Sequence, residues 1–118
     1  MYSTQSACDE CDVIYVPTDN TAAAYTETIA NVVLAAGVPV VAGESGICSG
    51  CGVATLSISY YDLGYTTGQM AASILTGEAD ISTMAIEYTN ATKKYNQAIC
   101  DELGLTVPEG YTAIEAAE

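Results

Sequence analysis

Apolar positions along the chain form short runs, separated by turn residues and by a segment with helical spacing. The first run, 12–16, is rich in β-branched and aromatic residues and ends at Pro17, which is typical of a buried parallel strand. Residues 21–36 carry apolar side chains at helical spacing up to Gly37, and a second apolar run follows at 38–42. This succession of strand, helix and strand predicts a βαβ unit.

The same pattern continues through the rest of the chain. The glycine-rich segment 43–52 predicts a loop, and the alternation over 53–60 predicts a strand. Helical spacing predicts helices over 62–75 and 93–103. We expect residues 85–88 to form a short strand or an extended crossing. Together these elements predict a small α/β fold with parallel strands.

Length and composition set the scale of this fold. The 118 residues suit one domain, and a hydrophobic content of 50% is that of a folded globular protein. We therefore expect a single partial α/β domain over residues 1–118, with its core at about 11–108 and an acidic, Ala-rich tail at 109–118.

The charge balance restricts the partners. Fifteen acidic residues face two cations, Lys93 and Lys94, so the net charge is −13. Nucleic acid is excluded as an expected partner because its phosphates are bound by clustered Lys and Arg. A bound anion would have to rely on backbone N–H groups and helix N-termini.

Targeting signals are not expected in this sequence. Its apolar stretches are shorter than the roughly 18 to 20 residues of a membrane span, and residues 1–5 have neither a basic nor an apolar export region.

The turn Thr18-Asp19-Asn20-Thr21 lies between a parallel strand and a helix, where open α/β sheets place ligands. Its N–H groups attract a carboxylate and Asp19 could accept an ammonium, which together suit a zwitterion. The alternative is that these side chains only cap the helix.

Two further residues extend this candidate site. Glu44 follows the second strand and should stand at the same edge of the sheet as Asp19, although a glutamate in a glycine-rich loop is commonly just solvated. Tyr60 and Tyr61 stand where the third strand meets its helix, so one of them could stack on a ligand ring, or the pair could be half-buried packing.

Cysteines support a rival hypothesis. The pairs Cys8-x-x-Cys11 and Cys48-x-x-Cys51 could form a tetrahedral zinc site or a redox dithiol, or the thiols could be unremarkable or disulfide-bonded. Cys100 fits a core position, and the chain has no His. No cofactor is expected, and no catalytic motif points to an enzyme.

Four segments resemble a known family. They are Cys11–Thr21, Val38–Glu44, Val53–Ala72 and Leu103–Pro108, and the most specific stretches are Val-Pro-Thr-Asp-Asn-Thr and Tyr-Tyr-Asp-Leu-Gly-Tyr. They are similar to ABC-transporter substrate-binding proteins whose better-known members bind tryptophan or tyrosine. Two positions depart from that family: Ser45, where an acidic residue is common, and Ala85, where proline is common.

The resemblance implies a Rossmann-like, three-layer parallel-sheet lobe of a type I periplasmic binding protein, and we expect this chain to be the C-terminal portion of one. It implies an amino acid or similar small zwitterion as solute, an ABC permease as partner, and an extracytoplasmic location, as a cell-surface lipoprotein or in the periplasm. Missing neighbours would leave a sheet edge exposed, so we expect a homodimer or a strand-exchanged dimer.

Overall fold

The computed structural model describes residues 2–114. Their contacts divide the chain into two compact units, one formed by the residues up to Ser57 and from Thr92 onward, and one formed by Ile58–Ala91. That residues 1–118 form a single partial domain stays a prediction, and the last residues of its predicted acidic tail, 115–118, lie outside the described part of the chain.

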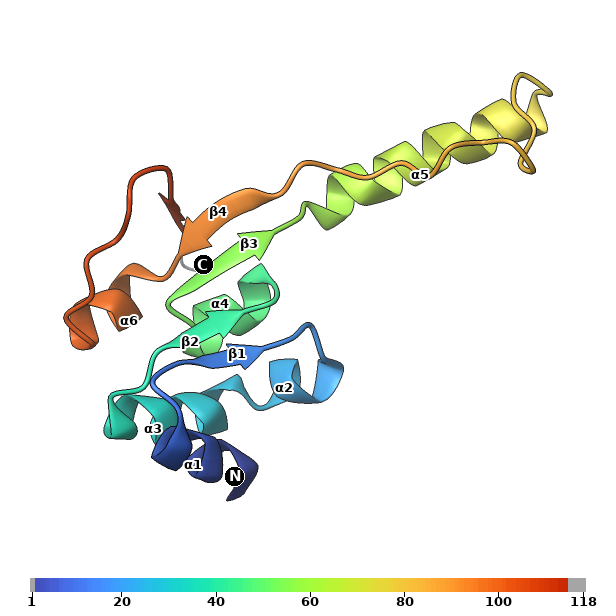
Figure 1. The fold of residues 1–118 in the computed structure, drawn as a ribbon. Coiled ribbons are helices and arrows are strands. Elements are labelled where there is room, and N and C mark those ends of the chain that lie inside the picture. Colours follow the sequence, from blue (N-terminus) through green and yellow to red (C-terminus); the bar gives the residue numbers. More distant parts are fainter. Residues whose placement is uncertain (1, 115–118) are drawn as a thin grey trace. The chain divides into compact units, whose positions relative to one another are not determined.

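A five-stranded sheet organises the first unit (Figure 1). The strands lie side by side in the order in which they occur in the chain: β1 (Ile14–Val16), β2 (Val40–Ala42), β3 (Ala54–Ser57), β4 (Thr92–Tyr95) and β5 (Thr112–Ala113). The first three strands are parallel, β4 runs antiparallel to β3, and β5 is parallel to β4. The predicted α/β class is confirmed, with a sheet that is mostly rather than wholly parallel.

Helices cover one face of the first strands. They are α1 (Tyr2–Glu10), α2 (Asn20–Ala24), α3 (Thr26–Ala36) and α4 (Ser45–Cys51). Val40 and Ala42 of β2 point into a core with Val33 of α3 and Ile47 of α4. A second cluster forms around α6 (Gln97–Glu102), where Ile99 packs with the residue preceding β3. The burial of these apolar side chains drives the assembly of the layers.

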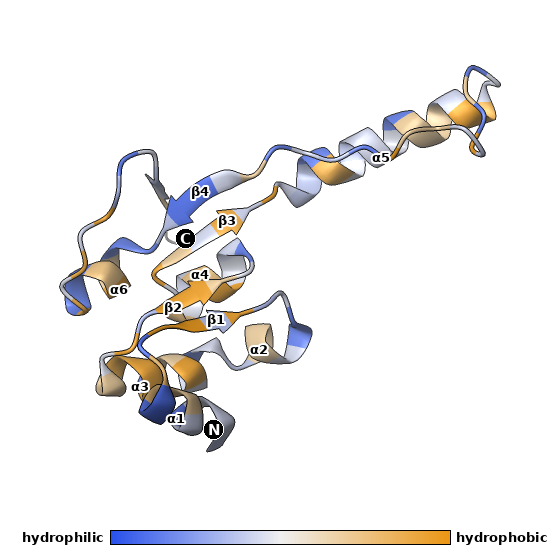
Figure 2. Ribbon diagram, in the orientation of Figure 1, coloured by the Kyte–Doolittle hydropathy of each residue, from blue (hydrophilic) through white to orange (hydrophobic). Residues whose placement is uncertain are grey.

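The opposite face of the same strands is exposed. Tyr15 and Leu56 keep 65% and 61% of their surface accessible, and Val41 is also exposed. Tyr15 pairs in register with Val41, so these side chains share one face of the sheet. Figure 2 shows that β1 and β2 are apolar strands, whereas β4 carries both lysines and is hydrophilic.

Three predictions about secondary structure were wrong. The segment 43–52 contains helix α4 rather than only a loop, the helix predicted over 21–36 is divided at Tyr25, and the helix predicted over 93–103 begins only at Gln97. Residues 85–88 form no strand, so of the two alternatives for this segment the extended crossing agrees with the structure. Helix α1 and strand β5 were not predicted from the sequence.

Tertiary contacts explain these differences. A Cβ on Gly50 would lie 2.3 Å from Thr26 Oγ1, so glycine lets α4 pack closely against α3 despite its low helix propensity. Residues 92–95 form backbone hydrogen bonds along β3, and this pairing replaces the helical conformation that local spacing favours.

The second unit consists of α5 (Tyr60–Leu75) and the segment that follows it to Ala91. The helix starts at Tyr60 because the Ser59 hydroxyl caps the N–H of Asp62. Its half-buried side chains, such as Leu63, recur at helical spacing, and none of residues 58–91 is fully buried. Within residues 2–114, every helix is too short or too polar to cross a membrane.

Candidate functional site

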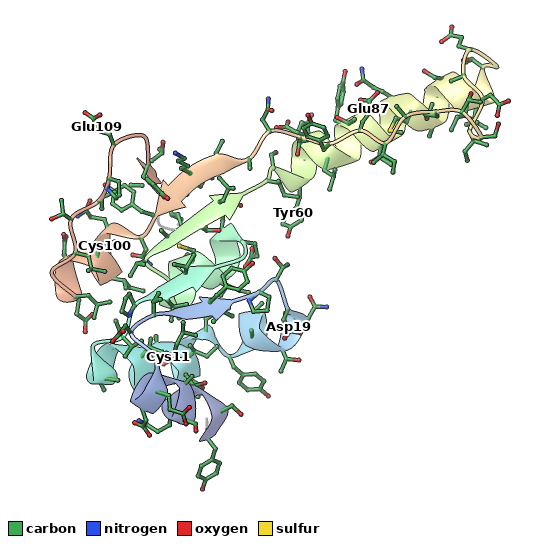
Figure 3. All side chains as sticks on the ribbon, viewed as in Figure 1. Cys11, Asp19, Tyr60, Glu87, Cys100 and Glu109 are labelled. Atoms are coloured by element: carbon green, nitrogen blue, oxygen red, sulfur yellow. The ribbon has the colours of Figure 1, made fainter. Side chains whose placement is uncertain are left out.

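The four predicted site residues Thr18–Thr21 span the β1–α2 turn and the first two residues of α2, and Figure 3 shows Asp19 there. Asp19 Oδ1 accepts a hydrogen bond of 2.8 Å from the N–H of Ala22, so this carboxylate caps α2. Its Oδ2 has no hydrogen-bond partner among residues 2–114. Asp19 therefore has the capping role that the sequence left open and still presents one exposed carboxylate oxygen.

Backbone donors accompany that oxygen. In the described part of the chain, no hydrogen-bond acceptor faces the N–H groups of Thr18, Asp19, Asn20 and Thr21. All four residues are exposed. The turn thus combines free backbone donors with one carboxylate, the set that a zwitterion requires.

The β2–α4 turn is held by Glu44. This half-buried carboxylate accepts hydrogen bonds from the N–H groups of Gly46, at 2.8 Å, and Ile47, and so caps α4. Both of its oxygens are engaged, but each carboxylate oxygen has a further lone pair.

These two turns lie against each other. The N–H of Gly43 donates to the carbonyl of Val16 over 2.8 Å. A Cβ on Gly43 would be 2.6 Å from the backbone N of Thr18 and 2.9 Å from its Oγ1. The structure therefore brings the turn with Asp19 and the turn with Glu44 together at the carboxyl ends of adjacent parallel strands, as the sequence predicted.

A hydroxyl pair lies at the same edge of the sheet and was not predicted as part of the site. Ser45 Oγ donates to Ser57 Oγ over 2.7 Å, and Thr92 Oγ1 donates to the carbonyl of Ser57. Ser57 is buried at the end of β3. The alternation over 53–60 could have indicated its inward direction, but the pairing with Ser45 depends on α4.

An open cavity of about 470 Å³ lies beside the first turn in the first unit, between α1, α2 and α3. Asp19 and Thr21 line it, whereas Thr18, Asn20 and Glu44 do not. Its other lining residues are Thr4, Ala22, Tyr25, Thr28 and Ile29.

Tyr60 belongs to the second unit, where it is the first residue of α5 and its ring is exposed. Its predicted role in ligand stacking stays a prediction.

The cysteines do not support the zinc hypothesis. No group of three or more potential metal ligands occurs in residues 2–114. Cys48 and Cys51 are buried in α4, where their thiols donate to the backbone carbonyls of Gly52 and Ile47. Cys11 is exposed before β1, and Cys100 is buried in α6 (Figure 3). All five cysteines are free thiols in this structure.

Burial raises the pKa of the Cys48 thiol to about 12, with further contributions from nearby Cys100, Cys51 and Glu44. It also raises the pKa of Cys51 to about 11. A reactive thiol requires the opposite shift, so these cysteines are suited to packing rather than to redox chemistry.

The fold is that of an α/β lobe with parallel strands, a class of fold in which ligands commonly bind beyond the carboxyl ends of the strands. Residues 1–117 match the family model described as ABC transporter substrate binding protein, and the chain belongs to this family.

A curated relative is the tyrosine-binding protein of Clostridioides difficile, strain R20291, which is 33% identical over 86 residues. The match covers 71% of this chain and 25% of the relative. This chain therefore spans only part of the curated protein that it resembles.

Solved structures agree with this assignment. A ligand-free, open substrate-binding protein with adhesive properties from Clostridium difficile shares 31% identity, with a TM-score of 0.78 over 98% of this chain and 40% of that chain. A domain from Streptococcus pneumonia in complex with L-Trp shares 27% identity, with a TM-score of 0.80 over 96% of this chain and 40% of that chain.

Proposed function

We propose that this chain forms part of the solute site of an ABC importer's substrate-binding protein, and that the solute is an amino acid or similar small zwitterion. The contact between Gly43 and Thr18 carries the proposal, since it joins two strand-end turns that each contain a carboxylate. The relatives support it further, because one is a tyrosine-binding protein and another is in complex with L-Trp.

The residues divide the recognition between them. The N–H groups of Thr18–Thr21 bind the α-carboxylate. Backbone donors take this role because the two cations of the chain, Lys93 and Lys94, lie on β4 and not in this turn. Asp19 Oδ2 binds the α-ammonium, and Glu44 adds negative charge beside it.

In this proposal the protein is a receptor and not an enzyme. It is extracytoplasmic, in the periplasm or as a cell-surface lipoprotein, and it delivers its solute to an ABC permease. Binding requires no cofactor, because backbone donors and carboxylates supply the polar contacts.

Isothermal titration calorimetry with L-tyrosine and L-tryptophan tests the proposal, using Asp19→Asn as the main variant. Asparagine caps a helix as well as aspartate does but carries no charge. We expect saturable binding by the wild-type chain and at least tenfold weaker binding by Asp19→Asn, with an unchanged free energy of unfolding. Asp12→Asn, an exposed carboxylate before β1, is the matched control and should bind normally.

Equal affinity of Asp19→Asn and the wild type would show that Asp19 is only a cap. Asp19→Ala should then lower the free energy of unfolding by about 1 kcal/mol without a specific effect on binding. A folded wild-type chain that binds neither amino acid would contradict the proposal for this chain.

A further inference from the structure

Gly43 lies where the two turns of the candidate site are in contact. It follows β2 directly, precedes Glu44, and is tied to β1 by the hydrogen bond from its N–H to the carbonyl of Val16. A side chain on Gly43 would meet backbone atoms on the other turn: the N of Thr18 at 2.6 Å and the carbonyl carbon of Pro17 at 3.0 Å.

Space, and not backbone conformation, requires glycine here. The glycines with positive φ in the described chain are Gly37, Gly77, Gly104 and Gly110, and Gly43 is not among them. An alanine could therefore adopt its backbone angles, but its Cβ would overlap the peptide between Pro17 and Thr18. A backbone cannot rotate aside as a flexible side chain can, so the two turns would have to separate.

Both carboxylates would move with their turns. Asp19 is fixed to α2 through the N–H of Ala22, and Glu44 is fixed to α4 through the N–H groups of Gly46 and Ile47. Neither side chain can compensate for the separation without giving up its cap.

We infer that Gly43 is a positioning residue of the solute site: its missing side chain sets the separation between the Thr18–Thr21 turn and Glu44, and thereby the affinity for the solute. This inference rests on the proposed function. It assigns Gly43 an effect on affinity that does not require contact between Gly43 and the solute. Polar contacts to a small ligand tolerate little displacement, so we expect Gly43→Ala to weaken binding at least tenfold.

A second glycine provides the matched control. A Cβ on Gly50 would lie 2.4 Å from the Cβ of Thr26, so Gly50→Ala also creates a clash, but between α3 and α4 and not between the turns. Gly50 likewise lacks a positive φ. Gly50→Ala thus reports what a packing defect alone does to the chain.

Two measurements on the full chain test the inference. Amide ¹H–¹⁵N chemical shifts of the ligand-free variants report the position of the Thr18–Thr21 turn, and calorimetry with L-tyrosine and L-tryptophan reports affinity. We expect Gly43→Ala to shift the Thr18 and Asp19 amide signals and to raise Kd at least tenfold. Gly50→Ala should lower the free energy of unfolding, while Kd and these amide signals stay close to those of the wild type.

The inference is overturned if Gly43→Ala leaves the amide signals of the turn unchanged, if it binds with wild-type affinity, or if Gly50→Ala weakens binding equally. Wild-type protein that binds neither amino acid contradicts the proposed function instead, and the amide shifts then decide whether Gly43 sets the position of the turn. If Gly43→Ala does not fold, the same substitution is made together with Thr55→Val, which is expected to stabilise the first unit.

Discussion

Asn96 and Ser49 are joined by a hydrogen bond of 2.9 Å from the side-chain amide of Asn96 to the backbone carbonyl of Ser49, 47 residues earlier in the chain. The same amide donates to the carbonyl of Cys48 at 3.2 Å, and Asn96 Oδ1 accepts from the N–H of Ile99. One side chain therefore binds the end of α4 and begins α6, which couples residues after the second unit to those before it.

Replacing Asn96 should destabilise the first unit. We expect Asn96→Ala to lower the free energy of unfolding by about 2 to 3 kcal/mol, because a helix cap and two hydrogen bonds to carbonyls are lost. Asn96→Asp keeps the cap acceptor but not the amide donors, so its effect should be intermediate. Urea unfolding followed by circular dichroism measures both, and equal stabilities of Asn96→Asp and the wild type would contradict a role for the amide.

Replacing Thr55 by valine should stabilise the protein. Its side chain is 2% exposed, and Oγ1 has no hydrogen-bond partner among residues 2–114. Valine has nearly the same shape without the buried hydroxyl, so we expect Thr55→Val to raise the free energy of unfolding by about 1 kcal/mol. Thr55→Ser, which keeps the hydroxyl and loses the methyl group, should be destabilising. A loss of stability in Thr55→Val would mean that the hydroxyl is hydrogen-bonded, for example to a buried water.

Alkaline pH should destabilise the chain through its buried thiols. The pKa values of Cys48 and Cys51 are raised from 9.0 to about 12 and about 11, so the unfolded chain releases these protons at lower pH than the folded chain. Their stabilising contribution is complete below about pH 9 and is lost as pH rises toward 11 and 12. We expect the free energy of unfolding to fall by up to about 1.4 kcal/mol per pH unit for each thiol.

Urea unfolding under reducing conditions at several pH values between 8 and 11 measures this slope. Cys51→Ala should reduce it, whereas Cys11→Ala, which removes an exposed thiol, should leave it unchanged. A slope that Cys51→Ala does not alter would assign the alkaline sensitivity to other groups.

The exposed sheet face should promote self-association. Leu56 lies on this face with Tyr15 and Val41, and parallel strands are normally covered on both faces. We expect Leu56→Thr to shift the chain toward monomer in analytical ultracentrifugation. Leu75→Thr, which removes an equally apolar exposed side chain from α5, is the control. Wild-type protein that is monomeric at high concentration would exclude the homodimer predicted from the sequence.

Local sequence was sufficient to predict the elements that depend on patterns within a few neighbouring residues. The apolar runs of β1 and β2, the helix ending at Gly37 and the candidate turn after Pro17 all agree with the structure, because strand and helix periodicity and turn residues act over a few positions. The βα position of Thr18–Thr21 followed from the same pattern, and so did the placement of Glu44 at the same edge.

Tertiary structure decided what depends on distant partners. Helix α4 forms in a glycine-rich segment because Glu44 caps it and Gly50 fits against Thr26, and β4 is a strand because β3 pairs with it over 54–57. The contact that joins the two turns, between Gly43 and Thr18, links residues 25 positions apart and leaves no local pattern. The sequence thus determined the class of fold and the place of each carboxylate at a strand end. Packing between distant segments determined how the two turns are arranged relative to each other, because steric fit depends on both of the segments in contact.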